Sequence, residues 1–352
     1  MNETAQTSEK TPDIEGVVDH ILGQIDRERE REIISRRFGL HDRKETLEQI
    51  GELLGITRER VRQLEKAILI RLKMSAESGM PEVEKLEKHF IRHLHEMGRA
   101  AKLQDLAERV KQDNNKHTKS HVAFVAELAP NLTVLGENDN YHHGVAIREH
   151  HADEKQLKGR VDEVVKTVKE NGEALEIESL HEKLGKYEHP DHTRALASLS
   201  KNLAHLRDTW GLTKWPTVNP KNIRDKIYVI LQDNGKPMHF SEIADSIKDS
   251  DFKRKDVTTQ AIHNELIKDK RFVLIGRGIY ALSEWGYSKG TVADIIADIM
   301  KKEKGPLHRD EIVRRVLKHR HVKETTILLN LQSKSQFKRV AKATYVLAES
   351  EK

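Results

Sequence analysis

A fourfold internal repeat constrains this chain more than any other feature of its sequence. Each copy contains the end of an apolar helix, a glycine-centred turn, and an apolar residue that begins a second amphipathic helix. The turn glycines are Gly98, Gly172, Gly235 and Gly305, which lie 74, 63 and 70 residues apart. These spacings are too long and too variable for a stacked solenoid, so they predict separate domains of about 65 residues each.

Apolar residues at spacings of three and four predict a packed helix after each turn. The spacing is clearest in the first copy, at Leu103, Leu106, Ala107 and Val110. Each copy then continues through another helix and ends in two short β-rich runs, clearest around the turn Gly276-Arg277-Gly278. Similar endings start at Asn131 and Phe337, whereas the second copy, ending DTWGLTKWP, fits least well. Three helices followed by a β-hairpin predict a winged-helix plan.

Composition excludes several classes of protein. The chain has no cysteine, which excludes disulfides, thiolate zinc sites and cysteine nucleophiles. No apolar run approaches the roughly 18 to 20 residues of a membrane span, and the first residues lack a secretory signal pattern. We therefore expect a cytoplasmic protein. Nucleotide-binding and hydrolase motifs (GxxxxGK[ST], GxGxxG, GxSxG) are absent, so we expect no enzyme and no cofactor.

Charge is distributed unevenly along the chain. Residues 1–220 carry 35 Lys and Arg against 39 Asp and Glu, whereas residues 221–352 carry 27 against 18. The C-terminal part therefore has a net charge of +9. This basic surface either attracts phosphate weakly or is simply exposed to solvent.

The strongest local pattern is a helix-turn-helix between residues 27 and 73. Thr46 can cap a helix, Gly51 lets the next helix approach closely, and Gly55 makes the turn. Thr57 can cap a second helix, whose inward stripe is Val61, Leu64 and Ile68. The opposite face gathers Arg58, Glu59, Arg62, Gln63 and Lys66. Arg pairs with guanine, Gln with adenine, and Glu accepts from cytosine, so this face is rich in base-reading chemistry.

The run TLEQIGELLGITRERVRQLE, with RRFGL ahead of it, closely resembles region four of the primary-type bacterial sigma factors, over roughly residues 26–73. The resemblance implies a reader of the −35 promoter element and a nucleoid-associated protein that acts on double-stranded DNA. It implies that the recognition helix contacts DNA, with Arg60 beside the DNA backbone. The implied DNA-contact residues are Thr57, Arg58, Glu59, Arg60, Arg62, Gln63 and Lys66. It also implies that the preceding helix touches the flap of the polymerase β subunit, through Arg31, Arg36, Arg37 and Phe38.

The chain departs from a working sigma factor. About a dozen polar residues precede the motif, which leaves no room for the region that opens the −10 element. We therefore expect a promoter reader that does not melt promoters by itself.

The third and fourth copies resemble HARE-type winged helices, as at the front of the RNA polymerase delta subunit. The resemblance rests on KPMHFSEIADSI with RFVLIGRGIYALSEWG, and on GPLHRDEIVRRV with FKRVAKATYVLAE. The expected fold is mainly α: a sigma region four-like helix-turn-helix followed by about four winged-helix modules. The expected boundaries are a disordered tail 1–12, the helix-turn-helix 13–78, winged helices 82–150 and 155–217, and HARE-type modules 221–287 and 290–349.

Histidines raise the question of a metal site. His89 with His93, and His117 with His121, have the i,i+4 spacing of two ligands on one helix face, but no third ligand matches them. We expect no metal site. The adjacent His142 and His143 fall in an expected wing tip, where they would face solvent or phosphate.

These patterns predict a sequence-specific DNA-binding transcription regulator in contact with RNA polymerase and without a small-molecule substrate. Its C-terminal modules would add phosphate contacts, through basic residues such as Arg314. An accessory polymerase subunit that acts mainly through protein contacts is the alternative, and a nuclease-associated DNA-binding protein is a more distant one.

Overall fold

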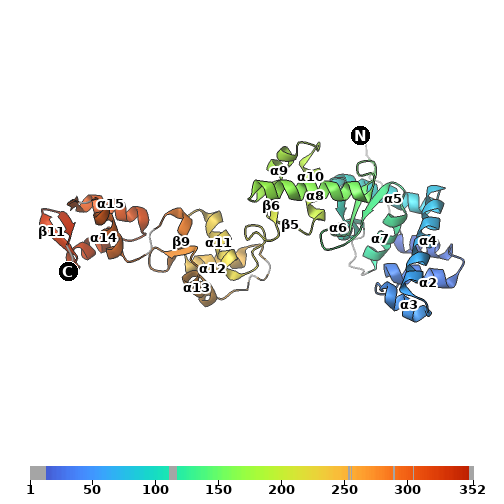
Figure 1. Cartoon of the computed structure of the whole chain (residues 1–352), viewed down its shortest axis with the longest axis horizontal. Helices are drawn as coiled ribbons and strands as arrows, with labels where there is room; N and C mark the ends of the chain where they lie inside the picture. Colours follow the sequence, from blue (N-terminus) through green and yellow to red (C-terminus); the bar gives the residue numbers. More distant parts are fainter. Residues whose placement is uncertain are drawn as a thin grey trace, which may run out of the picture. The chain divides into compact units, whose positions relative to one another are not determined.

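The computed structural model divides into two compact units, Met1–Thr213 and Lys214–Lys352 (Figure 1). It describes residues 13–110, 117–252, 254, 256–287, 290–303 and 305–348. The expected disordered tail at residues 1–12 lies outside this range. Within the described part, no helix is both long and apolar enough to cross a membrane.

The first unit opens with four helices: α1 (Ile14–Gly23), α2 (Glu28–Phe38), α3 (Leu47–Leu54) and α4 (Arg58–Glu77). The Asp13 side chain caps α1 by accepting a hydrogen bond from the amide of Gly16. Gly39 ends α2 in the left-handed conformation, with φ 68°. Glycine fits this position because an added Cβ would come within 2.7 Å of the Lys44 backbone nitrogen.

Four repeats follow, each in the order helix, strand, helix, helix, strand, strand. The first repeat contains α5 (Pro81–Glu96), β1 (Ala100–Lys102), α6 (Leu103–Val110), α7 (Thr118–Leu128), β2 (Leu132–Leu135) and β3 (Gly144–Ile147). The second contains α8 (Glu154–Asn171), β4 (Leu175–Glu176), α9 (Ile177–Leu184), α10 (Pro190–Leu199), β5 (Leu203–Leu206) and β6 (Thr209–Leu212).

The third and fourth repeats form the second unit. The third contains α11 (Ile223–Asn234), β7 (Met238–His239), α12 (Phe240–Asp249), α13 (Thr259–Lys268), β8 (Phe272–Leu274) and β9 (Ile279–Leu282), followed by the 3-10 turn Ser283–Trp285. The fourth contains α14 (Val292–Glu303), β10 (Leu307–His308), α15 (Arg309–His319), α16 (Glu324–Ser333), β11 (Phe337–Ala341) and β12 (Thr344–Leu347).

Each repeat closes its helices with a three-stranded antiparallel sheet in the order first, third, second strand. The hairpins predicted near Asn131, Phe272 and Phe337 are confirmed. The second repeat, which fitted the sequence pattern least, forms the same hairpin, with Leu203 opposite Leu212. Its turn contains Arg207 at φ 54° instead of a glycine, so the usual turn signal is missing from the sequence.

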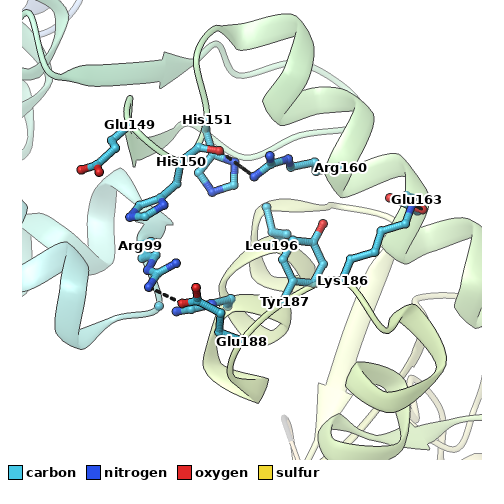
Figure 2. A pocket seen from close by; sticks show the side chains of 12 residues that line it. Arg99, Glu149, His150, His151, Arg160, Glu163, Lys186, Tyr187, Glu188 and Leu196 are labelled. Atoms are coloured by element: carbon cyan, nitrogen blue, oxygen red, sulfur yellow. Dashed lines mark hydrogen bonds and ion pairs between the residues drawn. The ribbon is translucent and has the colours of Figure 1, made fainter.

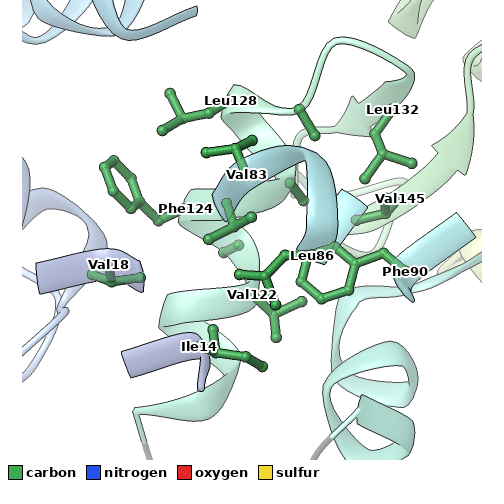
Figure 3. Packing of buried hydrophobic residues seen from close by; sticks show 14 of the residues in the cluster. Ile14, Val18, Val83, Leu86, Phe90, Val122, Phe124, Leu128, Leu132 and Val145 are labelled. Atoms are coloured by element: carbon green, nitrogen blue, oxygen red, sulfur yellow. The ribbon is translucent and has the colours of Figure 1, made fainter. Parts of the chain in front are cut away.

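The helix-turn-helix and the first repeat share one hydrophobic core. Figure 3 shows Ile14 and Val18 of α1 beside Val122 and Phe124 of α7. The cluster continues through α2 and α4 and reaches the sheet at Val145. One core therefore crosses the expected boundary near residue 80.

The first and second repeats are joined by polar contacts and close backbone packing. The Tyr141 hydroxyl donates to Asp162 at 2.6 Å, and the His142 amide donates to the Leu199 carbonyl at 2.9 Å. A Cβ added to Gly98 would lie 2.2 Å from the Asp191 carbonyl oxygen, so α10 can approach only a glycine there. His142 and His143 lie in the loop between β2 and β3, as expected, but both are half-buried, which corrects the expectation that they face solvent.

His151, at the same joint, makes the stability of the first unit depend on pH. Burial, with a smaller contribution from the charge of Arg160, lowers the pKa of His151 to about 4. An unfolded histidine titrates near pH 6.5, so between these values the unfolded chain binds more protons and stability falls as the pH falls. We expect acidification from pH 7 to 4 to remove on the order of 3 kcal/mol through this group.

Urea unfolding of the first unit at a series of pH values measures this effect. His151→Asn should reduce the pH dependence by about this amount, whereas the exposed His20→Asn should leave it as in the parent. A parent-like pH dependence in His151→Asn would assign the effect to other groups.

In the second unit, the third and fourth repeats meet at the hairpin of the third. The His321 amide donates to the Ile275 carbonyl at 3.1 Å, and the Arg320 guanidinium donates to the Leu274 carbonyl. A separate apolar cluster fills the fourth repeat, from Ile296 of α14 to Phe337 of β11.

Candidate nucleic-acid interface

The first helix of the helix-turn-helix is fixed by a reciprocal cap. The Thr46 hydroxyl accepts from the Gln49 amide at 3.2 Å, and the Gln49 side chain accepts from the Thr46 amide at 2.9 Å. Ile50 of α3 is buried against Ile33 of α2 and Val61 of α4. The helix sits on this small core, so its position relative to α4 is set by packing.

Gly51 sets the separation of the two helices. A Cβ built at Gly51 would lie 2.7 Å from the Ile56 carbonyl oxygen, closer than real Cβ atoms approach a backbone. Gly55 then ends α3 with φ 64°, and the Thr57 hydroxyl caps α4 by accepting from the Arg60 amide at 3.2 Å. The predicted roles of these turn and cap residues are confirmed.

Gly51→Ala should therefore destabilise the first unit although alanine is the better helix former. We expect a loss of about 1 to 3 kcal/mol in the free energy of unfolding, because α3 must move away from the turn. Gly159 is the matched control: it lies within α8 with open space around its Cα. Gly159→Ala should gain up to about 1 kcal/mol. Urea titration of both variants measures the sign of each change in the free energy of unfolding. Equal changes in the two variants would contradict the role of Gly51.

The predicted reading face lies on the first half of α4. All its predicted contact residues are exposed: Thr57, Arg58, Glu59, Arg60, Arg62, Gln63 and Lys66. Val61 and Ile68 are buried on the opposite side, and Leu64 is half-buried. The structure thus brings the predicted DNA-contact residues together on one exposed surface.

Arg62 and Glu59 form a bidentate pair within this face, with N–O distances of 2.9 and 2.6 Å. The Arg62 guanidinium lowers the pKa of Glu59, so the carboxylate stays ionised at neutral pH. In the described part of the chain, no acidic side chain lies close enough to Arg58, Arg60 or Lys66 to form an ion pair. The face therefore offers three uncommitted cations beside one preformed Arg–Glu pair.

Comparison with known proteins identifies this segment. Residues 27–74 match the family Sigma-70, region 4. The segment is a sigma-70 region 4 domain. The resemblance inferred from the sequence over residues 26–73 is thereby confirmed.

Curated relatives match only over the region 4 domain. The RNA polymerase principal sigma factor HrdD of Streptomyces griseus is 45% identical over 60 residues, 17% of this chain and 18% of that protein. The RNA polymerase sigma factor RpoS of Coxiella burnetii is 45% identical over 62 residues, 17% of each chain. HrdC of Streptomyces coelicolor, also a principal sigma factor, is 56% identical over 46 residues, 13% of this chain and 14% of that protein. The chain therefore spans less than a fifth of the length of these relatives.

The residues predicted to touch polymerase are held within the chain. Arg31 donates to the Ile25 carbonyl at 3.0 Å. Arg36 pairs with Glu32 and Glu45 at 3.0 and 2.8 Å, and Arg37 pairs with Glu65 at 3.1 Å. The Phe38 ring meets the edge of Phe124 in α7, with centroids 5.0 Å apart. Arg36, Arg37 and Phe38 therefore stabilise the region 4 domain and its attachment to the first repeat.

This attachment was not predicted from the sequence. The His121 imidazole contacts the Leu40 carbonyl at 2.8 Å, and Lys73 pairs with Glu127 at 2.6 Å. His121 and Glu127 follow the region 4 domain by about fifty residues, and no local pattern marks them as its partners. Among the residues that the structure describes, no group of three or more His, Asp or Glu could hold a metal ion.

Proposed function

We propose that this chain is a sequence-specific DNA-binding regulator of transcription, which reads a −35-like promoter element through its region 4 domain and works in contact with RNA polymerase. The observation that carries the proposal is the exposed cationic face at the start of α4, within a region 4 domain. Such a protein would act on the nucleoid in the cytoplasm, and we assign no reaction or cofactor to it.

The layout of α4 supports major-groove reading by its first half. Its 20 residues give a helix of about 30 Å. The polar face runs from Arg58 to Lys66, whereas the second half buries Ile68 and Leu72 in the core shared with the first repeat. The N-terminal end of the helix is thus free to meet base edges while its C-terminal end anchors it.

The Arg62–Glu59 pair suits base recognition. On DNA, Arg62 can exchange Glu59 for the O6 and N7 acceptors of guanine. Glu59 can then accept from a cytosine amino group, so both members of the pair gain a base partner.

We infer that the four repeats are winged-helix modules, of HARE type in the third and fourth. Their common element order and sheet order support this. The third helices of the first two repeats are covered: α7 lies in the shared core, and α10 packs on β1. In the third repeat, α13 exposes Gln260, Asn264 and Lys268. Additional DNA contacts therefore belong to the second unit.

The phosphate contacts in the fourth repeat fit its hairpin better than α15. Arg314, named from the sequence, pairs with Glu311 at 2.9 and 2.7 Å, so the pair carries no net charge and attracts phosphate only weakly. By contrast, Lys338, Arg339 and Lys342 are exposed on β11 and the following turn. We assign the phosphate contacts of the fourth repeat to these three residues, as sequence-independent attraction.

Titration of the full chain against a duplex with a −35-type element and against a shuffled duplex, at low and physiological salt, tests the proposal. We expect a preference for the −35-type duplex that persists at physiological salt. Equal binding to both duplexes that disappears with salt would reject it. That result, together with co-purification with core polymerase, would favour an accessory subunit, which the net charge of −4 on residues 1–220 also suits.

A further inference from the structure

The joint between the first and second repeats contains a cavity of about 410 Å³ (Figure 2). The turn after α5 contributes Arg99, and the turn before α8 contributes His150 and His151. Arg160 of α8 lies beside these histidines, and Lys186 of the turn between α9 and α10 also lines the cavity. Both repeats belong to the first unit, so the cavity is a built feature of that unit. Its volume lies within the range of small-molecule sites.

Three cations line the cavity, and one of them has no acidic partner. Arg160 donates to the His150 carbonyl at 2.6 Å and contacts the His151 imidazole at 3.2 Å. In the described part of the chain, no carboxylate lies within ion-pair distance of its guanidinium. A half-buried guanidinium with only neutral partners is a position that an anion would stabilise.

The other two cations are held by exchangeable partners at the cavity rim. Arg99 pairs with Glu188 at 2.7 Å, but 77% of the Glu188 side chain is exposed. Lys186 pairs with Glu163, and the Lys186 side chain is also mostly exposed. Exposed pairs of this kind contribute little to stability, so a ligand with a higher negative charge can replace the carboxylates.

The backbone at Arg99 adopts a conformation that is unusual for its residue type. Its φ is 69°, and its amide donates to the Leu94 carbonyl at 2.6 Å. Its carbonyl accepts from the Ile147 amide at 3.0 Å. Hydrogen bonds to Leu94 and Ile147 therefore hold the Arg99 backbone in this conformation. Figure 2 shows the resulting direction of the Arg99 side chain, across the cavity toward Glu188. Strain that is held by its surroundings in this way is typical of binding sites.

The remaining walls offer neutral donors and an apolar surface. Burial, with the charge of Arg99, lowers the pKa of both His150 and His192, so their imidazoles are neutral at pH 7 and can donate. Leu196 is buried, and Tyr187 is half-buried beside it in Figure 2. Glu149 also lines the cavity and is exposed.

We propose that this cavity binds a small phosphorylated molecule, whose phosphate lies between Arg99 and Arg160 and whose organic part rests on Tyr187 and Leu196. Two guanidinium groups and neutral imidazole donors match the charge and the several oxygens of a phosphate group. The site is independent of the reading face on α4, since none of its lining residues belongs to the region 4 domain.

Calorimetric titration of the full-length protein with phenyl phosphate, inorganic phosphate and phenol tests the site. Phenyl phosphate should bind most tightly, inorganic phosphate more weakly, and phenol should not bind at millimolar concentration. Arg160→Gln and Arg99→Gln should each weaken phenyl phosphate binding about tenfold, because each removes a charge-assisted contact. Arg109→Gln is the matched control, since it removes a cation of the first repeat that pairs with Glu96 outside the cavity.

Three results would overturn the proposal. The first is no saturable binding of phenyl phosphate, and the second is an equal loss in Arg109→Gln, which would indicate general charge attraction. The third is displacement of phenyl phosphate by duplex DNA, which would make the cavity a DNA-backbone contact. Arg99→Gln keeps the test decisive if Arg160→Gln fails to fold. Retained phenyl phosphate binding in Arg58→Ala/Arg62→Ala separates this site from the proposed DNA reading.

Discussion

The double variant Arg58→Ala/Arg62→Ala should lose its preference for a −35-type duplex. Each guanidinium that pairs with a base contributes about 1 to 3 kcal/mol of discrimination, so together they account for about 2 to 6 kcal/mol. Both side chains are exposed at the start of α4, away from the buried stripe of Val61 and Ile68, so their removal leaves the fold intact. Titration against −35-type and shuffled duplexes at physiological salt measures the loss.

A control variant with the same change of charge separates base recognition from general electrostatic attraction to DNA. Arg109→Ala/Lys88→Ala removes two exposed cations from α5 and α6. It should weaken binding to both duplexes slightly and equally, since it touches only the overall electrostatic attraction. An equal loss on both duplexes for Arg58→Ala/Arg62→Ala would contradict base reading and leave α4 with a phosphate-binding role.

Local chemistry explains why the helix-turn-helix was predictable from the sequence. The Thr46 and Thr57 caps, the Gly55 turn and the close approach at Gly51 each involve residues within a few positions of one another. A stripe at helical spacing then fixes which face of α4 is exposed. The reading face therefore follows from patterns that lie entirely within about twenty residues.

Local sequence patterns could not predict the short strands or the hairpin of the second repeat. β4, β7 and β10 have two residues each, too few to show an alternation. They are strands only because the hairpin of the same repeat offers a free edge. The turn at Arg207 likewise depends on strand pairing to hold a positive φ that its residue type does not favour.

Long-range packing decided the features that the sequence left open. The cavity at Arg160 is built from five segments between residues 98 and 196, which the docking of α10 on β1 helps to bring together. The engagement of Phe38 by Phe124 joins residues 86 positions apart. A resemblance to region four implied a polymerase contact for Phe38, but a family pattern carries no information about the modules fused to it.

Phe124→Ala should destabilise the first unit by about 3 to 5 kcal/mol, the usual cost of removing a buried phenyl ring. Phe124 is fully buried, and its ring contacts Phe38 edge to face at an interplanar angle of 65°. Urea unfolding should show the loss in the first unit and an unchanged transition in the second unit. Leu329→Ala, at a side chain that is 63% exposed on α16, should change neither transition by more than about 0.5 kcal/mol.

The same variant tests whether the reader and the first repeat fold as one structure. Because Phe124 belongs to the core that also contains residues of α1, α2 and α4, its loss should increase hydrogen exchange at α4 amides as well as at α7 amides. A double-mutant cycle between Phe38→Ala and Phe124→Ala should give a coupling of about 0.5 to 1.5 kcal/mol. Exchange that rises in α7 alone, with no coupling, would mean that the region 4 domain folds independently, as the repeat spacing first suggested. Parallel exchange in both helices would instead make the first repeat part of the platform that holds the reading face.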